Sequence, residues 1–128
     1  MQFDANSPIW LQVMNSIASD IVTGKRAPGE KLPGGRSLAL LYSINPNTVA
    51  RVYREMEDAA LVVTKRGMGT FVTEDKARIE ALRRQLAEGA VREFINKMRE
   101  LGVSPEEAAQ LLEREANHAG KQSSDQGI

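Results

Sequence analysis

Polar and basic side chains that can recognise nucleic acid cluster in the first half of this 128-residue chain. Asparagine pairs in a bidentate manner with adenine and arginine with guanine, while lysine, arginine and free backbone N–H groups hold phosphates. Glycine at a loop tip removes the side-chain bulk that would keep the loop out of a groove. Side chains of these types lie at Asn45, Asn47, Thr48, Arg51, Lys65 and Arg66, with Gly67 at a loop tip, and we take them as candidate DNA-binding residues.

The same sequence contains no pattern that is typical of an enzyme. The chain has no cysteine and one histidine, His118, which we expect to be an exposed residue near a helix end. We find no nucleophile paired with a base and no spacing typical of metal ligands. The glycines at 67 and 69 are not a dinucleotide fingerprint, because no helix pattern follows them. We therefore expect no catalytic residue, no metal and no cofactor.

Composition indicates a small helical protein with an aliphatic core, since 41% of the residues are hydrophobic and only 5% are aromatic. The formal net charge of zero at first argues against a nucleic-acid partner. Residues 1–73 carry a net charge of +2 and residues 74–128 carry −2. This difference is small, so the charge would favour nucleic-acid binding only if the basic residues cluster on one face. The first ten residues lack the basic n-region that is typical of a signal peptide, and no uncharged apolar run reaches membrane-spanning length. We expect a cytoplasmic protein without a membrane partner.

The segment from residue 45 to residue 59 has the pattern of an amphipathic helix with its own start signal. Asn45 can accept a hydrogen bond from the first turn, and Pro46 occupies the position where a missing N–H costs nothing. One stripe is apolar and is expected to pack on the core, comprising Val49, Val52, Tyr53 and Met56. The opposite face is polar and free to contact a partner, comprising Asn47, Arg51, Arg54 and Asp58. Arg54 can instead pair with Asp58 at i+4, which leaves its role open.

Three further elements are predicted before residue 74. Ser7 as N-cap and Pro8 at the first helical position begin a helix that Gly24 ends. A short apolar helix covers residues 36–42. Two runs rich in β-branched residues, joined by a loop with glycine, predict a β-hairpin over residues 61–73.

The remainder of the chain is predicted to form two more helices. The first begins near residue 75 and is weakened by about 1 kcal/mol at Gly89, where a kink is an open alternative. Gly102 ends it, and Ser104 caps the next helix. The predicted parts are a DNA-binding domain at 1–74, a helical dimerisation segment at 75–118 and a disordered tail at 119–128.

Two helices joined by a tight turn and followed by a hairpin with a basic tip are typical of a winged helix-turn-helix. The fold class is therefore mainly α with a small β-hairpin, followed by two C-terminal dimerisation helices. In such a fold the helix at 45–59 enters the major groove and the hairpin at 61–73, the wing, contacts the backbone or the minor groove.

The run from residue 7 to residue 73 resembles the DNA-binding domain of the GntR family of bacterial transcription regulators, and SPIWLQV and NPNTVARVYREME resemble its YtrA subfamily. The resemblance implies a repressor, often of genes for ATP-binding-cassette transporters. It also implies a phosphate or base contact for Arg36, recognition-helix contacts for Asn45, Asn47, Thr48 and Arg51, and wing contacts for Arg66 and Gly67.

Four positions depart from the family's pattern. Pro46 and Ala50 occupy slots that often hold arginine, so the protein should read its operator differently. Gly34 takes the place of a capping serine and loosens the start of the short helix. Ser43 takes the place of a turn glycine, and a positive φ there would cost about 1 kcal/mol.

The apolar stripes of the last two helices have too few partners within their own segment. Pairing with a second copy would bury them and place two recognition helices about one DNA turn, or a multiple of it, apart, which implies a homodimer on a palindromic operator. The alternative is that these helices fold back on their own winged domain. As a hypothesis, a small-molecule effector would change the angle between the paired helices. The competing function is a winged-helix protein-interaction module, which the zero net charge favours.

Overall fold

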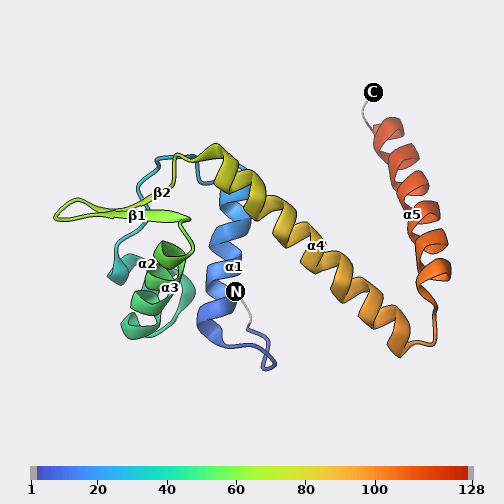
Figure 1. Ribbon diagram of the computed structural model, residues 1–128, viewed down its shortest axis with the longest axis horizontal. Helices are drawn as coiled ribbons and strands as arrows, with labels where there is room; N and C mark the ends of the chain where they lie inside the picture. The colour runs from blue at the N-terminus through green and yellow to red at the C-terminus, as the bar shows by residue number, and fades with distance from the viewer. Residues whose placement is uncertain (1–2, 127–128) are drawn as a thin grey trace. The chain divides into compact units, whose positions relative to one another are not determined.

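The computed structural model describes residues 3–126 and contains, within that range, five helices and one antiparallel hairpin (Figure 1). In chain order the elements are α1 (Ile9–Val22), α2 (Gly35–Tyr42), α3 (Pro46–Asp58), β1 (Val62–Lys65), β2 (Gly69–Val72), α4 (Lys76–Glu100) and α5 (Pro105–Gln126). This order confirms the predicted winged helix-turn-helix followed by C-terminal helices. The chain divides into two compact units, residues 1–85 and residues 86–128.

The first unit is built around α3, which packs against α1, α2 and β1. The residues that its helices bury are hydrophobic and are spaced at helical intervals, as predicted, and they include Val13, Ile17, Ile21, Leu38, Val49, Val52 and Met56. Leu82 on α4 is also buried, and the Arg78 Nε donates to the Ala59 carbonyl at 2.9 Å. The first turns of α4 therefore belong to this unit, although the sequence places the boundary after residue 74.

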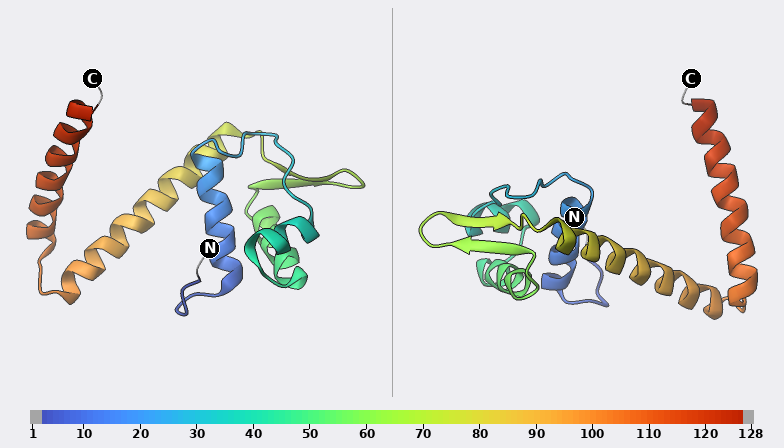
Figure 2. Two further views of the ribbon diagram at one scale, coloured as in Figure 1. Left: turned by 180° about the vertical axis from the view of Figure 1, so that it is seen from behind. Right: turned by 45° about the horizontal axis from the view of Figure 1, so that its top comes forward.

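The wing consists of the predicted hairpin and a further segment of the chain that lies beside it. Its two strands pair from Val62 opposite Val72 to Lys65 opposite Gly69, and they extend past α2 and α3 in both views of Figure 2. Residues 29–32 run beside β2, because the Val72 N–H donates to the Glu30 carbonyl at 2.9 Å. The Leu32 N–H likewise donates to the Thr70 carbonyl at 2.8 Å. The segment before α2 is thereby tied to the wing.

The start of α1 differs by one residue from the prediction. Pro8 is the N-cap residue and makes no side-chain cap, so Ser7 lies outside the helix. The Gln12 side chain reaches back instead, donating to the Ser7 carbonyl at 2.8 Å and accepting from the Asp4 N–H at 2.7 Å. These bonds tie the segment before α1 to the helix, but they do not cap the N–H groups of its first turn, so the predicted serine cap is absent.

Ser43 lies in the turn between α2 and α3 and adopts the left-handed conformation. The sequence raised this possibility, because Ser43 takes the place of a turn glycine. Its φ is 54° and its ψ is 49°. The next N–H, of Ile44, donates to the Ala39 carbonyl at 2.9 Å and so closes the end of α2. Only glycine adopts this conformation without a Cβ penalty.

We expect Ser43→Gly to stabilise the protein by about 1 kcal/mol, because it removes that Cβ penalty at the end of α2. Urea denaturation followed by circular dichroism measures the change. Ser37→Gly is the matched control, since Ser37 lies within α2 and should lose about 0.5 kcal/mol on the same substitution. A loss of stability in Ser43→Gly would contradict the prediction.

The second unit contains the C-terminal part of α4 and the whole of α5. Helix α4 continues through Gly89, and Gly102, with φ of 75°, lies in the turn that follows it. Ser104 caps α5 as predicted, since its Oγ accepts from the Glu107 N–H at 3.2 Å. No helix within residues 3–126 is long and apolar enough to cross a membrane.

The prediction of a disordered tail at 119–128 is wrong for residues 119–126. Helix α5 runs to Gln126, so residues 119–126 are helical. These residues contain no proline, and an α-helix can continue through a single glycine such as Gly120 at a cost of about 1 kcal/mol. Residues 127 and 128 of the predicted tail lie outside the described residues.

Candidate nucleic-acid interface

The N-terminal end of α3 is an exposed, capped helix start. The Asn45 Oδ1 accepts a hydrogen bond from the Asn47 N–H at 2.8 Å, and Pro46 follows as the first helical residue. Asn45 therefore acts as the cap that the sequence predicts, and this bond occupies its side-chain oxygen. The Asn47 side chain is exposed and that of Thr48 is half-buried. Free N–H groups at such a helix start favour a negatively charged ligand.

Arg51 makes two contacts within the chain that hold its side chain on one edge of α3. Its guanidinium carbon lies 4.5 Å from the centre of the Trp10 ring, on α1. Its Nε lies 3.8 Å from Oε1 of Glu55, one turn further along α3. Half of the side chain remains exposed. The helical wheel placed Arg51 on a free face, but the packing of α1 against α3 brings an aromatic ring to it.

Arg54 is also exposed, one turn after Ala50 and on the same helix. It forms no ion pair with Asp58 in the part of the chain that the structure describes, so the i+4 pair that the sequence left open is absent there. Arg54 and Arg51 thus share a helix and a charge but differ in their surroundings. This difference makes Arg54 a useful control for Arg51.

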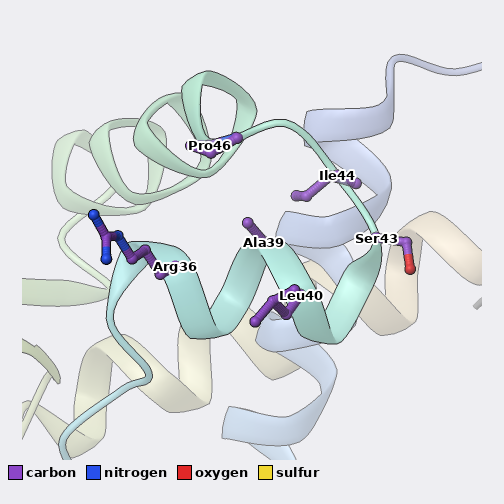
Figure 3. Close-up of a pocket in the computed structure, with 6 residues that line it drawn as sticks. All are labelled: Arg36, Ala39, Leu40, Ser43, Ile44 and Pro46. Atoms are coloured by element: carbon purple, nitrogen blue, oxygen red, sulfur yellow. The ribbon is translucent and has the colours of Figure 1, made fainter.

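Arg36 is the second residue of α2 and is exposed beside the start of α3. Figure 3 shows it at one end of an open depression between the two helices, which is otherwise lined by Ala39, Leu40, Ser43, Ile44 and Pro46. Gly34 is the N-cap residue of α2 and has no side chain that could accept a cap bond. The structure therefore brings Arg36 and the N-terminal end of α3 together.

Tyr53 fixes the segment that leads into α2. Its hydroxyl donates to the Pro33 carbonyl, and burial raises the pKa of Tyr53 to about 12. The phenol therefore stays protonated at neutral pH and remains a donor. Because Tyr53 lies on α3, this bond links the position of Arg36 to that of the candidate recognition helix.

The tip of the wing carries the remaining candidates, Lys65, Arg66 and Gly67, and all three are exposed. The Lys65 Nζ lies 4.7 Å from the centre of the Phe71 ring, on β2. Gly67 has a φ of 77°, a conformation that favours glycine. The chain thus turns sharply at a narrow and basic tip.

Lys31 joins this tip, although the sequence did not single it out. A Cβ added to Gly69 would lie 2.9 Å from Lys31 Cε, so the lysine stem crosses the glycine backbone closely. Lys31 also forms a β-bridge with Phe71. The turn-rich composition of residues 25–35 predicts a loop, and only the pairing of that loop with β2 could have placed a third cation here.

Comparison with known sequences gives a consistent family assignment. Residues 10–72 match the model for "Bacterial regulatory proteins, gntR family". The chain is 39% identical to the uncharacterised HTH-type transcriptional regulator YhcF of Bacillus subtilis, over 83% of this chain and 88% of YhcF. It is 30% identical to the HTH-type transcriptional repressor YtrA of the same organism, over 86% of this chain and 80% of YtrA.

Solved structures agree with the sequence comparison. A GntR family transcriptional regulator from Listeria monocytogenes is 38% identical and superposes with a TM-score of 0.78, over 88% of this chain and 98% of that one. The AraR DNA-binding domain in complex with operator ORX1 is 26% identical, with a TM-score of 0.53 over 57% of this chain and 93% of that one. The chain therefore belongs to the GntR family of DNA-binding bacterial transcription regulators, within the predicted YtrA subfamily.

Proposed function

We propose that this protein is a transcriptional repressor that binds a palindromic operator as a homodimer, with α3 in the major groove. The observation that carries the proposal is the polar edge at the start of α3, where exposed Asn47 and Arg51 and half-buried Thr48 lie on the helix whose other side buries Val49, Val52 and Met56. A helix anchored on one face presents the other in a fixed orientation, which base reading requires. The repressor YtrA and the operator-bound AraR domain support this assignment.

Base reading and phosphate binding are divided among the candidate residues. Asn47 and Arg51 have the side chains that suit purine edges, and Thr48 can contact either a base or a phosphate. Asn45 contributes by presenting the N–H groups of the first turn. The residues proposed to hold the backbone or enter the minor groove are Arg36, Lys65, Arg66 and Gly67, with Lys31 added by the structure.

The dimer is proposed from the second unit, which exposes apolar side chains that its own residues do not cover. Leu101 is 74% exposed, Leu112 51% and Leu111 38%. On a helix, Leu111 and Leu112 share a face with the fully buried Ala108. A second copy would cover this face and place two winged domains about 34 to 36 Å apart, or a multiple of that spacing. An effector would act by changing the angle between the paired helices.

A gel shift tests the proposed function directly. Duplex DNA from upstream of the protein's own gene is titrated with the protein at two salt concentrations, beside a scrambled duplex of equal length. Preferential binding of the first duplex that weakens with salt supports the regulator. If neither duplex shifts at micromolar protein, the zero net charge would instead point to a protein-interaction module.

For the wing, we expect Arg66→Ala to weaken binding to operator and scrambled DNA by a similar factor. It should also reduce the slope of log affinity against log salt by about 2 for the proposed dimer, because each of the two subunits loses one phosphate contact. Fluorescence anisotropy at several salt concentrations measures both quantities. Arg83→Ala is the control, since Arg83 lies on α4 and pairs with Glu80. A change in base preference with an unchanged slope would show that Arg66 reads bases.

A further inference from the structure

We infer that Trp10 is a positioning residue that sets base preference by holding the Arg51 guanidinium against α3, without contacting DNA itself. The inference rests on the proposed function, in which Arg51 reads a base. It starts from the 4.5 Å separation between the Arg51 guanidinium carbon and the centre of the Trp10 ring. Trp10 is the only tryptophan in the chain and the second residue of α1.

A stacked guanidinium keeps its hydrogen-bonding edge available. Aromatic stacking occupies the face of the planar group, whereas bidentate pairing with guanine uses the N–H groups at its edge. The ion pair with Glu55 involves Nε, at 3.8 Å. Among the described residues, the polar contact of Arg51 is the one from Nε to Glu55, and its terminal nitrogens have no hydrogen-bond partner. The two contacts therefore fix the side chain and leave its reading edge free.

Trp10 is itself held firmly enough to serve as a support. It is half-buried and lies on the same helix as Val13 and Ile17, which are buried in the core. Helix α1 packs against α3 over that core. An unsupported arginine loses considerable rotamer freedom when it binds, and a side chain already restricted in the free protein loses less. Trp10 thus reduces the entropy cost of the Arg51 contact.

The first test asks whether the contact exists in solution. Because Trp10 is the sole tryptophan, its fluorescence reports on its own surroundings alone. Arg51→Ala should shift the emission of the free protein, and Arg54→Ala should leave it unchanged. Equal emission from Arg51→Ala and the unmodified protein would overturn the inference.

The second test measures base preference. The probes are a duplex selected from a random-sequence pool by the unmodified protein, and a scrambled duplex of the same composition. Trp10→Leu should lower the ratio of the two affinities about two- to fivefold for each of the two half-sites, the range of a cation–π contact, with binding to scrambled DNA unchanged. Trp10→Phe keeps an aromatic face and should restore most of the ratio. Ile9→Ala, an exposed neighbour on α1, should leave the ratio unchanged.

A double-mutant comparison separates positioning from a general loss of stability. Added to Arg51→Ala, Trp10→Leu should have no further effect on the ratio, since the residue it positions is gone. Independent, additive losses would overturn the inference. So would tighter specific binding by Trp10→Leu, because that would mean that the ring withholds Arg51 from DNA. If Arg51→Ala itself keeps the full ratio, the proposed reading role of Arg51 fails and the inference fails with it.

Discussion

Replacing both Leu111 and Leu112 with aspartate should convert the protein from a dimer to a monomer at micromolar concentration. Both side chains lie on the face of α5 that the second unit leaves exposed. A dimer interface would bury them, and an aspartate buried there without a partner is strongly unfavourable. Operator affinity should fall by about a hundredfold or more, because two linked heads bind with an effective concentration that a single head lacks.

Multi-angle light scattering gives the mass, and anisotropy gives the affinity for the selected duplex. The control is Gln110→Asp with Asn117→Asp, which adds the same charge to the opposite side of α5. Circular dichroism should show equal helix content in both variants. A monomer mass for the unmodified protein would contradict the dimer proposal, and so would a monomeric variant that keeps full operator affinity.

Local start and stop signals were enough to predict most of the helices. Asn45 with Pro46, Ser104, and the glycines at 24 and 102 act within one turn of the chain, and the structure contains a cap or a turn at each of them. The apolar stripe of α3 was also predictable, because Val49, Val52 and Met56 follow the helical period. Backbone hydrogen bonding and periodicity are properties of short segments, so the sequence displays them directly.

Contacts between distant segments were not predictable in the same way. The stacking of Arg51 on Trp10 joins residues 41 positions apart, and it depends on how α1 packs against α3. The bridge from Lys31 to Phe71 likewise needs a loop to lie beside a strand. A helical wheel considers one helix at a time. It therefore predicts that the Arg51 face of α3 is free, whereas Trp10 of α1 partly covers that face.

The conformation of Ser43 could not be predicted from the sequence alone, although its place at a turn that usually holds glycine suggested a positive φ. Ser43 does adopt the left-handed conformation, at the turn that orients α3 against α2. Pro46 lines the same depression as Arg36 and carries no charge at the start of α3. Since the resemblance leads us to expect arginine at position 46, we expect more of the discrimination to depend on Arg51.

Arg51→Ala should accordingly relax base preference at one position of each half-site, at a cost of about 1 to 3 kcal/mol in discrimination per half-site if the contact is bidentate. The loss should appear as a lower affinity for the selected duplex and little change for scrambled DNA. Anisotropy titrations with duplexes substituted at each position in turn would locate the base. Arg54→Ala removes the same charge from the same helix and should preserve the preference, since Arg54 is exposed and lies outside the proposed reading edge.

A second substitution distinguishes base reading from simple attraction to phosphate. Arg51→Lys keeps the positive charge but lacks the planar fork that pairs with guanine, so it should lose base preference nearly as far as Arg51→Ala does. A phosphate contact would respond differently, because lysine would then restore affinity for every duplex together with the salt slope. That result would move Arg51 from the reading edge to the backbone contacts and would leave Asn47 and Thr48 as the base readers of α3.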